Sequence, residues 1–334
     1  CYIDLLQDQY VSLNVINNNT LNRLGFKYGD NIPLSKKIKI AREKSVPFFI
    51  TGSFEKRNDQ FFVSMQLYDS KTGQAILKKE LQNDDLFTLI DEMTLSLKRG
   101  LDLSETHINE SIDLPISSQL TPSIIALEYY IKAGILYQQD DSDVLLALRL
   151  MNEAIKEDPY FSWAYFTNAG FYAELNKMDS LDFSLDKTIE NIDRFPGFYH
   201  YYVKYQYYLI KKMPDKSFYV LDTWVKKYPD NIEGHRTLAY YYLSNEMFNE
   251  AITEYEQILA IDPNEYRAYY YLSKIYKETD NYEKAIEYKK KYMNATASSS
   301  DGCILVADLF QQIGEFDSAK VYYQQAEMLA PMAL

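Results

Sequence analysis

Small, apolar and aromatic residues recur every 34 residues in the last third of the chain. The pattern is clearest between Gly234 and Ala297. A fixed period of about 20–50 residues predicts a stacked-repeat fold, in which each repeat is one supersecondary unit. Two positions depart from the pattern: 34 residues after Tyr255 the chain has Lys289, and 34 residues after Pro263 it has an alanine. The positions that keep their type are Leu238 with Leu272, Ala239 with Ser273, Tyr242 with Tyr276 and Phe310, and Ala251 with Ala285 and Ala319.

The recurring types predict a pair of helices in each repeat. We expect small residues where the two helices cross, because the backbones approach closely there, and large aromatic residues between one pair and the next. Pro263 and Pro331 are expected to end second helices, since proline has no amide hydrogen to continue the ladder. One pair cannot bury its apolar face alone, so stacked pairs are expected to bury a continuous core. The expected crossing residues are Ala239, Ala251, Ala285, Ala307 and Ala319, and the expected aromatic residues are Tyr242, Tyr255, Tyr276, Phe310 and Tyr323.

These residues resemble the tetratricopeptide repeat, a helix–turn–helix unit of 34 residues. Earlier stretches from Ser123 onward carry the same types at a looser spacing, which makes about six repeats over residues 123–334. The resemblance implies a mainly α protein, with an α–α superhelix of about six helix pairs that follows a small α/β domain.

Residues 46–81 follow a different pattern, in which apolar residues alternate with a period of two. Alternation predicts strands, and the turns at residues 57–59 and 70–73 predict that neighbouring strands are antiparallel. A helix is expected from Asp84, because acidic residues suit the positive end of a helix dipole. Its expected buried stripe is Leu86, Phe87, Ile90, Met93, Leu97 and Leu101. The predicted strands are Val46–Gly52, Phe61–Tyr68 and Gln74–Leu81. In the region before them, we expect the end of a helix (Tyr2–Gln7), a strand (Tyr10–Ile16) and two short helices (Thr20–Leu24 and Ser35–Lys44).

The order of motifs in this region is similar to the small α/β domain at the amino terminus of TolB. The resemblance is carried by Phe49–Phe54, Val63–Asp69, Thr72–Gln74 and Asp84–Phe87. It implies a small α/β domain at residues 1–103, which often precedes tetratricopeptide repeats in bacterial signalling proteins. Most of the first helix of such a domain is missing, which implies truncation at its start. Residues 104–122 are polar and carry two prolines, so we expect a linker there, before a repeat domain at residues 123–334.

Length and charge narrow the classes of partner. The chain has 334 residues, which predicts about two domains. Its formal net charge of −13 argues against nucleic acid as a direct partner, because binding phosphates requires a basic surface. No run of about 18 apolar residues occurs, so no membrane span is expected in this segment. A protein or peptide partner is therefore favoured.

The first residue allows two interpretations. Cys1 is either the lipid-modified cysteine of a mature lipoprotein or the start of a fragment. The amphipathic run Tyr2–Leu6 favours the fragment, because it follows at once and reads as the end of a helix. With Cys303 as the second cysteine, no disulfide framework is expected. The localisation is accordingly either extracytoplasmic, as part of a membrane-anchored bacterial protein, or cytoplasmic.

Motifs for catalysis, cofactors or metals do not stand out. The sequence has no glycine-rich phosphate loop, no paired Cys or His motif for zinc and no nucleophile elbow. His107, His200 and His235 are isolated in sequence, and a surface or helix-face position is expected for them. The run Asp140–Asp143 lacks the glycine and the glutamate of a calcium loop, so a solvated loop and helix cap is expected instead. The sequence predicts no enzyme, no cofactor and no metal.

The resemblance to tetratricopeptide repeats implies a groove, lined by the second, fifth, ninth and twelfth positions of each repeat. Aromatic residues cluster at these positions in the middle repeats and cations in the fourth and fifth, so we expect a peptide with apolar side chains and one or two carboxylates. In the alternative interpretation, the aromatic residues pack the superhelix and the cations are solvated. The groove asparagines of chaperone-binding members are not found. The predicted groove residues are Trp163, Phe166, Tyr199, Tyr202, Gln206, Arg236, Tyr240, Arg267, Tyr270, Lys274 and Lys277.

The expected function is a protein-interaction or sensory segment of a larger bacterial signalling or regulatory protein. The resemblances imply an output module upstream, such as a winged-helix DNA-binding domain, a nucleotide cyclase or a protein kinase, and none of these is present in this sequence. The alternative is a stand-alone extracytoplasmic scaffold, such as a lipoprotein for envelope assembly. The sequence upstream of Cys1 would separate the two.

Overall fold

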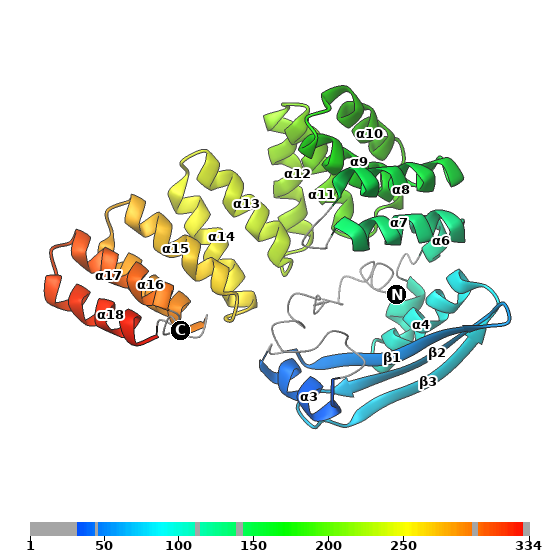
Figure 1. The fold of residues 1–334 in the computed structure, drawn as a ribbon, viewed down its shortest axis with the longest axis horizontal. Coiled ribbons are helices and arrows are strands. Elements are labelled where there is room, and N and C mark those ends of the chain that lie inside the picture. Colours follow the sequence, from blue (N-terminus) through cyan, green and yellow to red (C-terminus); the bar gives the residue numbers. More distant parts are fainter. Residues whose placement is uncertain (1–31, 44–45, 111–113, 138–142, 296–299, 330–334) are drawn as a thin grey trace. The chain divides into compact units, whose positions relative to one another are not determined.

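A computed structural model of the chain describes residues 32–43, 46–110, 114–137, 143–295 and 300–329 (Figure 1). It divides into two compact units, residues 1–217 (unit 1) and 218–334 (unit 2), and each is described by itself. The elements predicted before Leu24 lie outside the described residues.

The described part of unit 1 begins with a short helix and a three-stranded antiparallel sheet of order β1-β2-β3. The predicted strands are confirmed, but β1 extends well beyond Gly52, because the β1–β2 hairpin pairs without interruption as far as the Asn58-Asp59 turn. Both turn residues have positive φ angles, 47° and 63°, as a two-residue type I′ turn requires. Gly52 permits the close pairing, since a Cβ there would lie 2.3 Å from the carbonyl oxygen of Ser64. The elements are α3 (Leu34–Glu43), β1 (Phe48–Arg57), β2 (Gln60–Asp69) and β3 (Ala75–Asn83).

Helix α4 (Leu86–Gly100) joins the sheet to the helices that follow. Asp85 caps its first turn by accepting hydrogen bonds from the amides of Phe87 and Thr88. Leu89 and Leu97 are buried in the same apolar cluster as the inner side chains of β2, and α4 lies along this face of the sheet in Figure 1. Phe87 is instead buried in the first cluster of the repeat helices. The helix therefore contributes to two cores.

Residues 104–122, for which a linker was expected, contain two short helices, α5 (Glu105–Glu110) and α6 (Ile116–Gln119). Ile116 and Leu120 are buried in the same cluster as Phe87. The amide of Ile116 also donates a hydrogen bond of 3.0 Å to Asp91 of α4. This segment is thus ordered in its described part, while the domain boundaries at residues 103 and 123 stay predictions.

Six successive helix pairs follow, and their spacing confirms the predicted period. The first helices of the last three pairs begin at residues 232, 266 and 300, and the second helices at residues 248, 282 and 316, each 34 residues apart. In Figure 1 the first helices of unit 2 lie along one side and the second helices along the other. In chain order, the helices are α7 (Ile124–Tyr137) and α8 (Val144–Glu157), α9 (Ser162–Glu174) and α10 (Met178–Glu190), α11 (Tyr199–Ile210) and α12 (Pro214–Lys227), α13 (Ile232–Ser244) and α14 (Phe248–Ile261), α15 (Tyr266–Glu278) and α16 (Tyr282–Ala295), and α17 (Ser300–Gln312) and α18 (Phe316–Leu329). Helix α12 crosses the boundary between the two units.

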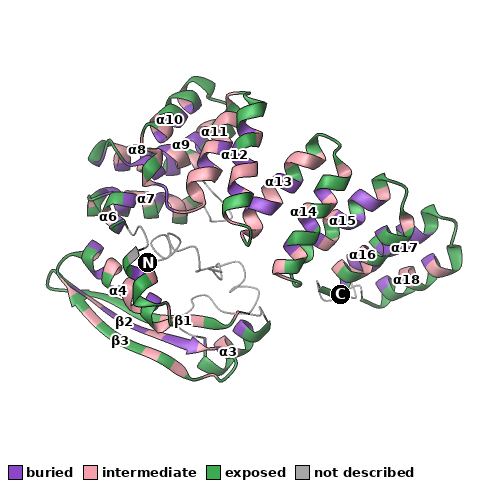
Figure 2. Cartoon of the chain, turned by 180° about the vertical axis from the view of Figure 1, so that it is seen from behind, coloured by how far each residue is buried: buried purple, intermediate pink, exposed green. Residues whose placement is uncertain are grey.

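Side-chain size decides where these helices touch. All five alanines expected at crossings are buried, as are Tyr255, Tyr276 and Phe310 among the expected aromatic residues. Figure 2 shows buried positions in purple between exposed positions in green along the helices. Tyr242 and Tyr323 are half-buried and pack against the same cluster. The predicted core of unit 2 is therefore confirmed in its described part.

The turn inside a pair repeats as closely as the helices do. One residue adopts a left-handed conformation, and the next amide bonds back to the aromatic residue near the end of the first helix, as in a Schellman motif. The amide of Met247, for example, donates a 2.9 Å hydrogen bond to the carbonyl of Tyr242. The left-handed residues are Asn176, Lys212, Glu246, Asp280 and Gly314.

Candidate functional site

The predicted groove residues fall into both units, and the structure places each group separately. Trp163, Phe166, Tyr199, Tyr202 and Gln206 belong to unit 1, on α9 and α11. The remaining predicted residues lie in unit 2, on α13 and α15.

In unit 1 the four predicted aromatic residues form one cluster with a fifth, Phe195. The ring of Trp163 lies 4.6 Å from Phe195 and 5.1 Å from Tyr199, between ring centroids. Phe166 lies 6.0 Å from both Phe195 and Tyr202. Trp163 is only 7% exposed, so it packs within unit 1 and offers little surface to a partner.

The sequence prediction missed Phe195, which precedes α11 in the segment between η2 (Ile192–Arg194) and that helix. Its position before Pro196, in a loop where polar residues are usual, was the available signal. The indole nitrogen of Trp163 is buried and has no hydrogen-bond partner among the described residues. Gln206 lies one turn beyond Tyr202 and is half-buried.

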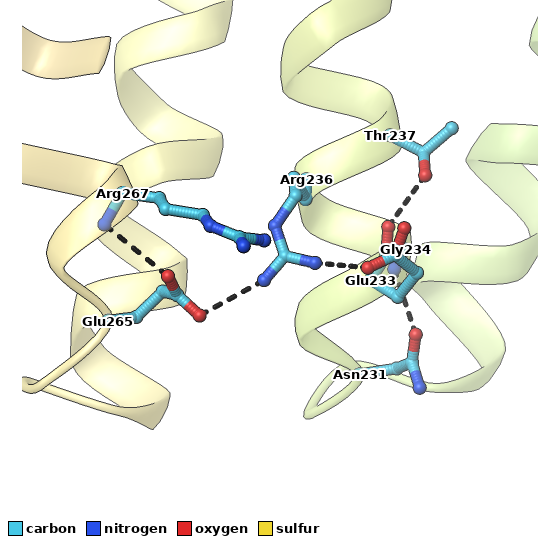
Figure 3. A network of polar contacts seen from close by, with 7 residues as sticks. All are labelled: Asn231, Glu233, Gly234, Arg236, Thr237, Glu265 and Arg267. Carbon is cyan, nitrogen blue, oxygen red and sulfur yellow. Dashed lines mark hydrogen bonds and ion pairs between the residues drawn. The ribbon is translucent and has the colours of Figure 1, made fainter. Parts of the chain in front are cut away.

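In unit 2, Arg236 lies within a network of charges that the sequence prediction did not include (Figure 3). Its guanidinium donates to Glu233 on the same helix and, at 3.0 Å, to Glu265 at the start of α15. Glu265 also caps α15 by accepting a hydrogen bond from the amide of Arg267. Figure 3 shows the side chain of Arg267 extending toward Arg236. The ion pair between Arg236 and Glu265 links the fourth and fifth repeats. Because two carboxylates compensate the charge of Arg236, this charge is less available to a partner.

One side of α15 presents the other predicted cations. Arg267, Tyr270, Lys274 and Lys277 are three or four residues apart, so they share one face of the helix. Arg267 and Lys274 are exposed, Lys277 is half-buried and Tyr270 is 37% exposed. Within the described part of unit 2, no carboxylate forms an ion pair with these three cations. Among the described residues, the fifth repeat therefore has a positive face whose cations form no direct ion pair.

A buried lysine lies behind this face. Lys289 on α16 is 7% exposed, and its amine is 4.5 Å from the ring centroid of Tyr270 and 5.5 Å from that of Tyr292. The rings of Tyr270 and Tyr292 are themselves 5.5 Å apart. Burial, and then the charge of Lys277, lowers the pKa of Lys289.

His235 lies on a face of helix α13, within the expected surface or helix-face positions, and that face is buried. It is 5% exposed, with Nδ1 at 2.6 Å from a carboxylate oxygen of Glu254 and Nε2 at 2.7 Å from the carbonyl of Pro229. Both neighbours are acceptors, so only the imidazolium, which carries two N–H groups, satisfies both. Burial lowers the pKa of His235, but the hydrogen bonds to Glu254 and Pro229 outweigh burial and leave this pKa above its ordinary value.

Other expectations about sites concern metals and membranes. Asp143 caps α8 by accepting a hydrogen bond from the amide of Leu146, as the helix-cap interpretation predicts, and the rest of that acidic run lies outside the described residues. Within the described ranges, no three His, Cys, Asp or Glu side chains converge as a metal site would require. None of the helices that the structure describes combines the length and the apolar character of a membrane span.

Comparison with known protein families finds matches in unit 2. Residues 242–297 and residues 300–331 each match the family described as tetratricopeptide repeat. A comparison with characterised protein sequences gives no match.

Among solved structures, the chain is similar to PilW, described as a widely conserved type IV pilus biogenesis factor. The two are 17% identical with a TM-score of 0.50, over 62% of this chain and 94% of PilW. Pseudomonas aeruginosa pilF is 17% identical over 62% of this chain and 93% of its own, with a TM-score of 0.47. YrrB, described as a TPR protein with an unusual peptide-binding site, is 18% identical over 51% and 86%, with a TM-score of 0.36. At these identities the likeness concerns the fold alone. The matched segments, the period of the helices and the buried crossing residues show that this chain carries tetratricopeptide repeats, in a mainly helical fold preceded by a small three-stranded sheet.

Proposed function

We propose that this chain is a non-catalytic interaction segment that binds a protein or peptide partner on the first helices of its repeats. The observation that carries the proposal is the exposure of aromatic and cationic side chains at groove positions of α13 and α15. Tyr240 is 60% exposed, and Arg267 and Lys274 are exposed as well. Tyrosine and arginine dominate binding hot spots, because they offer large contact areas and forked hydrogen bonds.

The biological setting of this interaction is part of the proposal. We favour a segment of a larger bacterial signalling protein, because the motifs of residues 49–87 resemble the TolB amino-terminal domain. An extracytoplasmic scaffold for envelope assembly is the second candidate. PilW, whose fold is similar, is described as a pilus biogenesis factor, and that description motivates the second candidate. The full open reading frame tests the setting, since an upstream output module supports the first candidate and a lipid-modification motif supports the second.

The binding surface is tested by photo-crosslinking in cells of the source organism. A benzophenone amino acid replaces Tyr240 in one variant and Tyr219 in a matched control, since Tyr219 on α12 is also a tyrosine and is 70% exposed. We expect position 240 to crosslink to a discrete partner and position 219 not to do so. Tyr240→Ala should then weaken binding of that partner by about 2 kcal/mol or more, whereas Tyr219→Ala should not. Equal crosslinking at both positions, or at neither, would contradict the proposed surface.

A further inference from the structure

Helix α7, the first helix of the first pair, exposes aliphatic side chains. The exposed residues of α15, by contrast, are all charged residues or tyrosines. Four isoleucines of α7 are exposed: Ile124 by 36%, Ile125 by 55%, Ile131 by 49% and Ile135 by 57%. Isoleucine is a weaker helix former than leucine or lysine, and apolar surface left in water brings no gain from burial. These isoleucines therefore add little to the stability of a single chain.

The exposed isoleucines lie on one face of α7 together with two charged residues. An α-helix turns by about 100° per residue, so residues 124, 128, 131 and 135 follow one line along it, and residues 125 and 132 flank that line on one side. Ala126 and Ala133, on the opposite side of the helix, are fully buried. We call this exposed face the α7 stripe. Its members are Ile124, Ile125, Glu128, Ile131, Lys132 and Ile135.

The two charges lie near the middle of the α7 stripe. Glu128 and Lys132 are one turn apart and form an ion pair of 3.2 Å, with side chains that are 61% and 60% exposed. Each of them lies two residues from position 130, and Ile125 and Ile135 each lie five residues from it. If the stripe is read in the opposite direction from position 130, glutamate therefore falls on lysine and isoleucine falls on isoleucine.

We propose that the α7 stripe binds the α7 stripe of a second copy of this chain, with the two helices antiparallel about a two-fold axis near residue 130. Glu128 of each copy then lies beside Lys132 of the other copy, and Ile125 lies beside Ile135. Such an interface uses the same surface on both copies and closes as a dimer. The inference goes beyond the proposed function, because it concerns the first helix pair and does not depend on a partner of α13 and α15.

A second copy fits the α7 stripe better than an unrelated apolar helix does. An apolar helix would cover the isoleucines, but it would also desolvate Glu128 and Lys132 and offer no new partner to either charge. A second copy offers an opposite charge to each, so that two intrahelical ion pairs join in one network of four charges. A contact between single helices is at the low end of interface sizes, and we expect a dissociation constant in the micromolar range.

Sedimentation velocity of the full chain, over about 1–200 µM, tests the proposal. Salt at about 0.15 M screens the general repulsion between two chains of net charge −13. We expect a monomer–dimer equilibrium. Glu128→Lys and Lys132→Glu should each weaken dimerisation at least about tenfold, because like charges then meet across the axis. Glu287→Lys is the matched control, since Glu287 forms an ion pair of the same spacing on α16, and it should leave dimerisation unchanged.

A mixture of the two charge variants gives the sharpest result. Lysines 128 and 132 of one variant then face glutamates 128 and 132 of the other, so the mixture should form dimers about as well as the wild type does. A folding defect would not be repaired by mixing. Restored association therefore supports the proposal, and failure of the mixture to associate would overturn it.

The apolar part of the α7 stripe is tested by Ile131→Gln. It should weaken dimerisation about tenfold, whereas Ile304→Gln, at an isoleucine of α17 that is 39% exposed, should not. A wild-type chain that stays monomeric over the whole range, or a dimer that none of the variants at positions 128, 131 and 132 weakens, would overturn the proposal. Crosslinking at position 240 is measured separately, so the proposed function stands if only the dimer fails.

Discussion

The same repeat positions serve different purposes in the two units. In unit 1, Trp163 and Tyr199 stand at predicted groove positions, and Trp163 packs against both Tyr199 and Phe195. In unit 2, Tyr240 and Tyr270 stand at predicted groove positions and stay exposed. The alternative interpretation of the groove, that its aromatic residues pack the superhelix, therefore describes Trp163 well, whereas Tyr240 and Tyr270 are free to contact a partner.

The connections between repeats explain the difference. Residues 191–198 join α10 to α11, and this longer connection places Phe195 over the ring of Trp163. Residues 262–265 join α14 to α15 and leave Tyr270 partly exposed. The position of a residue in its repeat thus sets its place on the helix. The length of a connection between repeats determines whether a residue of the connection covers that side chain.

The largest effect is expected from Trp163→Ala, which tests whether this tryptophan belongs to the core. Removing a buried tryptophan should cost about 3–5 kcal/mol, because the cavity is filled only in part. Hydrogen exchange of the α9 and α11 amides measures that loss within unit 1. Tyr240→Ala is the matched control at an exposed groove position and should change stability by less than about 0.5 kcal/mol. Similar losses in both variants would remove the distinction between the two units.

A smaller effect is expected at the helix crossings of unit 2. Ala251→Leu or Ala285→Leu should cost about 1–3 kcal/mol through overpacking, since both alanines are fully buried. Ala260→Leu, at an exposed position of the same helix as Ala251, should change stability by about 0.5 kcal/mol or less. Melting temperatures of the three variants check the register, and a common value for all of them would show that it is wrong.

The smallest effect is a dependence of the stability of unit 2 on pH, which we expect from its buried histidine, His235. The pKa of His235 in the folded chain lies above its ordinary value of about 6.5. Its stabilising contribution is therefore complete below about pH 6.5 and is lost as the pH rises through the higher folded value. The protection factors of the α13 amides, which correct for the intrinsic pH dependence of exchange, should fall over that range, and His235→Gln should abolish this fall although His107 and His200 remain. A fall that persists in the variant would show that His235 is not its source.

Much of the fold was predictable because periodicity reports burial directly. The starts of α13, α15 and α17 and the buried alanines at their crossings follow from a period of 34 residues. Alternation located the strands of the sheet, although the end of β1 depended on hairpin pairing that alternation does not encode.

The chemistry of the site was less predictable, because polarity is a poor guide to where a long side chain lies. Lysine is mostly exposed in proteins, yet Lys290 is half-buried with its amine 5.0 Å from the ring centroid of Phe310. Lysine stems cover aromatic surface while the amine stays near water or a ring face. The pairing of Arg236 with Glu265 was also hidden, since the two residues lie in different repeats. Such contacts depend on three-dimensional neighbours that one sequence does not identify.

The turns within the helix pairs show why these repeats diverge so readily in sequence. Four of the five left-handed positions described above carry Asn, Lys, Glu or Asp, and only Gly314 is glycine. A side chain in that conformation costs about 1–2 kcal/mol, so the backbone bond to the preceding helix, rather than the residue, must hold the turn. Several residue types are therefore tolerated at these positions, and a motif that required glycine there would miss four of the five described turns. What recurs from pair to pair is the backbone path of the turn, while its sequence varies.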